Sequence, residues 1–147
     1  MHRSSRKSGR ISFVLLAGLC SVVLIALLFL FSGESAQTGA SEFMTALAKA
    51  DAKGLAKRSV IHDQTEEQRE KTWEETLKYS KTFMFHWALG ASKDDGKKGA
   101  VKLDYTKNPF NPSSYPEHFE LVLVKKDDGW KVDATQISRD MYPYLPQ

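Results

Sequence analysis

The chain has 147 residues, of which 41% are hydrophobic and 27% are charged, and its formal net charge is +3. The first 36 residues hold four of the 21 basic residues and one of the 18 acidic residues, so the 111 residues after them carry 17 of each. A neutral domain lacks the basic face with which nucleic-acid-binding proteins neutralise phosphates, which excludes nucleic acid as a partner. A length of 111 residues suits one domain.

A basic start is followed by an apolar run of 21 uncharged residues, Ile11 to Phe31. As a helix, this run would span about 30 Å, the thickness of the hydrocarbon core of a bilayer. The basic residues stand directly before the run, so the N-terminus should stay in the cytoplasm. We therefore expect a cytoplasmic tail over 1–10, a transmembrane helix over 11–31 and a domain outside the cytoplasm. The predicted location is the bacterial inner membrane, which the chain crosses once.

Two other interpretations of the apolar run stay open. A cleaved signal peptide has a shorter apolar region of about 7 to 15 residues, and the best cleavage position here follows Ser35, with Gly33 at the third position before the cut. Lipidation would use Cys20, the only cysteine, but Leu19 stands before it where lipoprotein signals have a small residue. We expect an uncleaved anchor. With its one cysteine in the run, the outer domain can form no internal disulfide.

The segment after the run predicts a tether and two short helices. Residues 32–40 are rich in Gly, Ser and Ala, which is typical of a flexible tether. Ser41 is expected to cap a helix that carries Phe43 and Leu47 on one face. Asp51 is expected to cap a second, shorter helix.

A longer helix is predicted next. Thr65 and Gln68 have the spacing of a capping box, in which each side chain satisfies a backbone N–H of the other. Trp73 and Leu77 then lie on one helical face, while most other positions are charged. The helix should cover a larger structure on that side only. His62 and Asp63, which precede it, are read as turn residues.

The second half of the chain alternates with a period of two, which predicts strands. Turn residues at 94–96 and 127–129 and a proline-rich loop at 108–116 divide it into four strands. Short strands in sequence order after helices predict an α+β domain over 41–138, with a four-stranded antiparallel meander and an aromatic, proline-containing tail over 139–147. The apolar residues expected on the buried face are Phe83, Phe85, Trp87 and Leu89, then Val101, Leu103 and Tyr105, then Phe119, Leu121 and Leu123, then Trp130, Val132 and Ala134.

This order of elements, together with the last strand after the 127–129 turn (Gly129, Trp130, Lys131, Val132), resembles the nuclear transport factor two-like superfamily. Within it, the chain is similar to small bacterial extracytoplasmic domains of lumazine-binding-like type. The resemblance implies a sheet curved into a cone, with the long helix across its concave face, where enzyme members hold the substrate. The fold hosts enzymes, scaffolds and binding modules, so it does not fix the function.

The candidate site residues follow from that cone. Six aromatic residues could line a pocket inside it, although a domain of this size also needs them for its core: Trp73, Phe85, Trp87, Tyr105, Phe119 and Trp130. The polar candidates for a general base are His86, Asp104 and His118. Strand alternation puts His86 and Asp104 on the sheet face opposite the expected interior.

No catalytic, cofactor-binding or metal-binding residue is predicted, because the sequence has no HExxH pair, no glycine-rich phosphate loop and no GxSxG elbow. We predict a membrane-anchored binding or protein-interaction module without catalytic activity, such as a subunit of an envelope complex, with no cofactor. The alternative is a small-molecule carrier, or a lyase- or isomerase-type enzyme, that uses the cone. A filled, apolar cone favours the first, and an open cone with a polar group inside favours the second.

Overall fold

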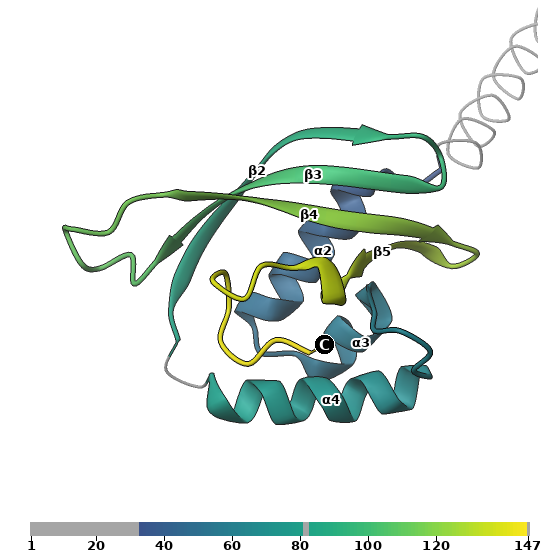
Figure 1. The fold of residues 1–147 in the computed structure, drawn as a ribbon, viewed down its shortest axis with the longest axis horizontal. Coiled ribbons are helices and arrows are strands. Elements are labelled where there is room, and N and C mark those ends of the chain that lie inside the picture. The colour runs from purple at the N-terminus through teal and green to yellow at the C-terminus, as the bar shows by residue number, and fades with distance from the viewer. Residues whose placement is uncertain (1–32, 81–82, 147) are drawn as a thin grey trace, which may run out of the picture. The chain divides into compact units, whose positions relative to one another are not determined.

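Three α-helices and a five-stranded mixed sheet make up the part of the chain that the computed structural model describes, residues 33–80 and 83–146 (Figure 1). The α+β prediction is confirmed. The expected cytoplasmic tail and transmembrane helix lie outside the described residues. Within the described ranges, no helix combines the length and the apolar character that crossing a membrane requires.

The sheet has the order β1-β5-β4-β3-β2, in which β2 to β5 form the predicted antiparallel meander. The sequence did not predict β1, which has two residues and pairs in parallel with β5. So short a strand has no periodicity to detect, and only its pairing identifies it. The strands are β1 (Ser59–Val60), β2 (Phe85–Asp94), β3 (Lys98–Lys107), β4 (Glu117–Lys126) and β5 (Gly129–Asp133).

Helices α3 (Ala52–Arg58) and α4 (Glu66–Tyr79) begin where the sequence predicts. The Asp51 side chain caps α3 by accepting from the Gly54 N–H at 3.0 Å. At α4, the capping box forms in both directions, because Thr65 accepts from the Gln68 N–H and the Gln68 side chain accepts from the Thr65 N–H. These starts depend on neighbouring residues alone.

The start of the first helix corrects the sequence prediction. Helix α2 (Ala36–Ala48) is capped by Ser35, not Ser41, and it includes most of the stretch read as a tether. The small residues there serve close packing. A Cβ at Gly39 would lie 2.7 Å from the Cβ of Trp130 in β5, so only glycine lets the helix approach the sheet this closely.

The helix that lies against the inner face of the sheet is α2, whereas the family resemblance assigned that place to the long helix (Figure 1). The long helix α4 packs instead against α3 and the C-terminal segment. Its Trp73 ring still reaches inward, where its indole N–H donates to the Ser59 hydroxyl at 2.8 Å.

The C-terminal segment packs back on the domain. Tyr142 and Leu145 are buried. The Thr76 hydroxyl of α4 donates to the Tyr144 carbonyl at 3.1 Å, and the Ser80 hydroxyl donates to the Pro143 carbonyl at 3.3 Å. The segment thereby closes the space between α4 and the sheet, and it adds side chains to the core.

Candidate functional site

The inner face of the sheet is packed with apolar side chains. Along β3, Val101, Leu103 and Tyr105 are fully buried, while Lys102 and Asp104 between them are exposed. The phase predicted for this strand is therefore confirmed. The largest side chains with no exposure in the core come from helices, strands and the segments between and after them: Trp73, Tyr105, Phe43, Met44, Leu55, Ile61, Leu103, Leu121, Leu123, Met141 and Val101.

The six aromatic residues proposed as a pocket lining do not lie in one place. Phe85, Tyr105 and Phe119 form one cluster, with ring centroids 4.9 Å apart for the first pair and 5.8 Å for Tyr105 and Phe119. Trp73 packs instead on Phe43 of α2, at 5.8 Å. Trp87 is half-buried on strand β2, directly opposite Tyr105 and therefore beside this cluster, whereas Trp130 is buried beneath α2.

The Tyr105 hydroxyl is a polar group buried in this interior. It is buried and has no hydrogen-bond partner among the described residues. Burial raises the pKa of Tyr105 far above its ordinary value, because the phenolate would have almost no solvation there. Sequence reasoning proposed this residue as part of an aromatic lining, but it could not show that the hydroxyl lacks a partner.

The polar candidates His86, Asp104 and His118 lie on the other face of the sheet, where the strand alternation predicted the first two. Asp104 of β3 and His118 of β4 are cross-strand neighbours, and the His118 Nδ1 lies 2.7 Å from the Asp104 Oδ1. Their side chains are 57% and 80% exposed. His86 is also exposed, and it lies opposite Thr106 on β3, so the structure brings two of the three candidates together.

This exposed pair is poorly suited to general acid–base catalysis. A catalytic histidine or carboxylate is normally held in a desolvated site that adjusts its pKa, whereas water screens the Asp104–His118 pair on both sides. Its neighbours on the outer face are Lys102 and Glu120, which also oppose each other across β3 and β4. Together these four side chains border a surface hollow of about 480 Å³.

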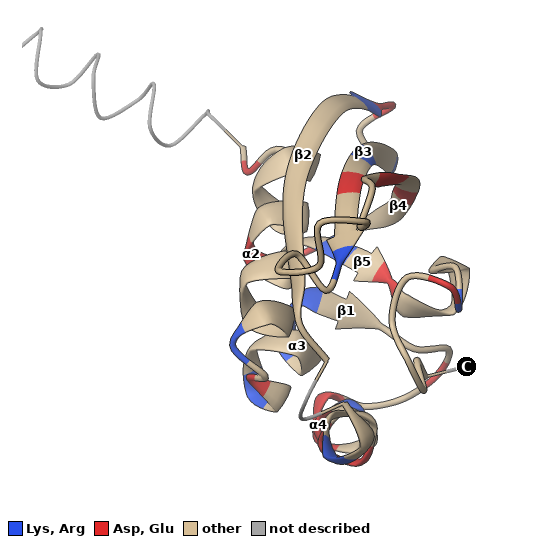
Figure 2. Ribbon diagram, turned by 90° about the vertical axis from the view of Figure 1, so that its left-hand side faces the viewer, with Lys and Arg blue, Asp and Glu red and all other residues tan. Residues whose placement is uncertain are grey.

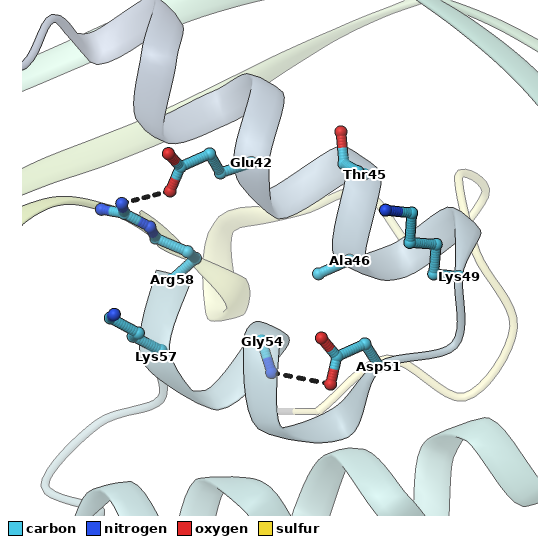
Figure 3. Close-up of a pocket in the computed structure, with 8 residues that line it drawn as sticks. All are labelled: Glu42, Thr45, Ala46, Lys49, Asp51, Gly54, Lys57 and Arg58. Atoms are coloured by element: carbon cyan, nitrogen blue, oxygen red, sulfur yellow. Dashed lines mark hydrogen bonds and ion pairs between the residues drawn. The ribbon is translucent and has the colours of Figure 1, made fainter.

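A second hollow, of about 250 Å³, lies between α2 and α3 (Figure 3). Sequence analysis did not predict this hollow, because residues from two helices meet there only in the fold. Arg58 forms an ion pair with Glu42 at its edge, and the Asp51 carboxylate is occupied by the cap of α3. Lys49 and Lys57 complete a polar, open rim. This rim has no nucleophile beside a general base, so its chemistry is that of surface ion pairs.

No three His, Cys, Asp or Glu side chains within residues 33–80 and 83–146 come together as a metal-binding group. We therefore assign no metal ligands in this part of the chain. The outer face and the α2–α3 hollow offer hydrogen bonds and charge, through which another molecule could be recognised. Within the described residues, the inner face offers the Tyr105 hydroxyl as a buried group without a partner.

Comparison with known proteins identifies the fold. No protein-family model matches the chain, and no curated protein matches it significantly. Among solved structures, it is similar to a protein from Thiobacillus denitrificans described as a calcium/calmodulin-dependent protein kinase type II association domain, with a TM-score of 0.50 and 10% identity over 68% of this chain and 90% of that one. A designed NTF2-like protein has a TM-score of 0.47 and 13% identity over 63% of this chain and 87% of that one. The domain therefore has the nuclear transport factor two-like fold, as the sequence resemblance implied.

Proposed function

We propose that the chain is a non-enzymatic module, anchored in the bacterial inner membrane, that binds a protein partner in the envelope through the outer face of its sheet. The observation that carries this proposal is the distribution of polar and apolar groups between the two faces. The inner face is filled by core side chains, while Asp104 and His118 project into solvent on the outer face. A fold of this kind supports either binding or catalysis, and the filled interior favours binding.

The outer face has the composition of a recognition surface. Exposed charges of both signs, Lys102 with Glu120 and Asp104 with His118, lie in two adjacent cross-strand rows. Half-buried apolar groups continue the same face, with Val122 opposite Ala100. Alternating charges beside apolar area suit a polar interface, in which charge complementarity selects the partner. The similar protein described as an association domain gives an independent precedent for assembly through this fold.

The proposal predicts that the outer face holds the chain in a complex. Native membranes that contain the full chain would be solubilised gently and separated by size under native conditions. The chain should migrate well above its monomer mass, and Glu120→Lys should shift it toward the monomer. Glu74→Lys, the same charge change at an exposed position of α4, is the matched control and should have no effect. Migration as a monomer without any substitution would contradict the proposal.

A second candidate is the small-molecule carrier or lyase- or isomerase-type enzyme. The observation that favours it is the Tyr105 hydroxyl, which could donate to a ligand carbonyl beside the half-buried rings of Phe85 and Phe119. Tyr105→Phe separates the two proposals. It removes the buried hydroxyl that has no partner among the described residues and keeps the ring, so it should abolish ligand binding in a carrier or enzyme and leave the complex of an interaction module intact.

A further inference from the structure

The turn between β2 and β3, the turn between β4 and β5 and the start of α2 meet at one end of the domain, which we call the turn end (residues 34–36, 93–99 and 125–129). Figure 1 shows both turns on the same side, with the β3–β4 loop on the opposite side. The Lys125 N–H donates to the Lys97 carbonyl at 2.8 Å, which joins the two turns. Ala36 packs on Gly99, where an added Cβ would lie 3.0 Å from the Ala36 Cβ.

Glu34, where the domain begins, is held firmly at the turn end. Its carboxylate accepts from Arg58 at 2.8 Å, and its carbonyl lies 3.4 Å from the Lys125 Nζ. It also lies over Gly129, which has a φ of +125° and no side chain to obstruct it. The path of the chain into the domain is therefore fixed by contacts with α3 and with the β4–β5 turn.

The distance from the proposed membrane span to this point is short. The apolar run ends at Phe31, and three residues of extended chain reach at most about 11 Å, to Glu34. The headgroup region on each side of a bilayer is of similar thickness, about 5 to 8 Å. A domain attached at Glu34 by so short a connection must keep the turn end close to the headgroups.

The charges at the turn end suit that position. Five lysines and four aspartates lie in the two turns (Lys93, Lys97, Lys98, Lys125 and Lys126; Asp94, Asp95, Asp127 and Asp128). Three of the aspartates are occupied within the domain. Asp94 accepts from the Gly96 N–H, Asp95 accepts from the N–H groups of Lys97 and Lys98, and Asp128 pairs with Lys131 at 2.8 Å.

Unlike these aspartates, four of the five lysines are exposed and unpaired within the described residues. Lys93, Lys97, Lys98 and Lys126 are exposed, and they make no ion pair with any residue in the described ranges. Figure 2 shows basic and acidic residues together on the β2–β3 turn, and an uncharged β3–β4 loop. The opposite end of the sheet thus offers no comparable group of free cations, since residues 108–116 carry no charge.

We propose that the turn end faces the membrane and that its exposed lysines contact anionic lipid headgroups. This inference rests on the proposed membrane anchor. Each lysine held near an anionic surface raises the affinity for that surface by about fivefold. The contact would fix the orientation of the domain, so the outer face of the sheet would be presented sideways to a partner in the same membrane.

The test uses the full chain in vesicles that contain lipids with a nitroxide on the headgroup. A single cysteine for a fluorophore is placed at the turn end (Lys97→Cys or Lys126→Cys) or in the β3–β4 loop (Ser113→Cys), each with Cys20→Ser. Strand β3 alone spans about 30 Å, so a probe at 113 lies far from the turn end. Quenching at 97 and 126 should be several-fold stronger than at 113.

The lipid composition tests the headgroup contact separately. Quenching at position 126 should be stronger in vesicles with about a third of anionic lipid than in zwitterionic vesicles, and Lys97→Gln with Lys98→Gln should remove that difference. Equal quenching at all three positions, in a chain that resists extraction at alkaline pH, would overturn this inference and leave the anchor intact. No effect of lipid charge would overturn the lysine contact. Extraction of the chain from the vesicles would overturn the anchor and this inference together.

Discussion

The two faces of the sheet use neighbouring residues of the same strands for different purposes. On β3, the inward side chains Leu103 and Tyr105 are fully buried, while Asp104 between them is exposed and pairs with His118. The inner face therefore contributes to stability, and the outer face is free to recognise another molecule. The difference teaches that the inward-facing aromatic residues of the sheet belong to the core, although the same residue types line ligand pockets elsewhere.

The largest effect on stability should come from Trp130→Ala on the inner face, compared with an exposed aromatic residue of the β3–β4 loop. The ring is 3% exposed beneath α2, and removing a buried aromatic side chain typically costs about 3 to 5 kcal/mol of unfolding free energy. Phe110→Ala removes an aromatic ring that is 81% exposed, so it should change the stability by less than about 0.5 kcal/mol. Urea unfolding of both variants gives the comparison. A loss below about 1 kcal/mol at Trp130 would mean that the helix does not cover this ring.

A smaller loss of stability is expected from Gly39→Ala, at the position where α2 approaches the sheet. Gly39→Ala inserts a methyl group 2.7 Å from the Trp130 Cβ, and such overpacking costs about 1 to 3 kcal/mol, partly offset by the higher helix propensity of alanine. Gly33→Ala is the control, because nothing lies within 4 Å of its added Cβ. If thermal unfolding shows both variants to be equally stable, the close contact between α2 and β5 is absent.

Tyr105→Phe should leave stability unchanged or raise it by up to about 1 kcal/mol at pH 8, since it removes a buried hydroxyl that has no partner. The folded pKa of Tyr105 is raised above its ordinary value of 10.0. The contribution of the neutral Tyr105 side chain to the free energy of unfolding is therefore fully present below pH 10. It is lost as the pH rises further, because Tyr105 ionises first in the unfolded chain. The variant should lose less stability than the parent chain between pH 9 and 11. A clear loss of stability at pH 8 would reveal a partner for the hydroxyl.

The smallest effects are expected on the outer face. His86→Ala and Asp104→Asn should each change the unfolding free energy by less than about 0.5 kcal/mol, because both side chains are exposed. Neither should alter small-molecule binding by the purified chain, measured by calorimetry. Loss of a ligand or an activity at unchanged stability would place chemistry on this face and would favour the enzyme or carrier alternative.

Features set by neighbouring residues could be predicted from the sequence. The capping box of Thr65 and Gln68, the cap at Asp51 and the phase of strand β3 all depend on residues within a few positions of one another. The start of α2 could not be predicted in this way. Its glycine and alanine residues suggest flexibility locally, and only the distant Trp130 shows that they allow close packing.

In the candidate site, too, contacts between distant residues could not be predicted from the sequence. The alternation predicted that Asp104 and His86 lie outside the core, but the contact between Asp104 and His118 depends on the register of β3 and β4 across a long loop. The absence of a partner for the Tyr105 hydroxyl depends on residues from several elements at once. Such features follow from the packing, not from spacing along the chain.

The most direct test of the central claim is crosslinking from defined positions on the two faces, in the native membrane. A photoreactive side chain would replace Glu120 on the outer face or Trp87 on the inner face, where it is half-buried. We expect a specific protein adduct from position 120, reduced by Lys102→Glu, and none from position 87. An adduct from position 87 alone, or no adduct from either position, would contradict recognition of a protein partner through the outer face.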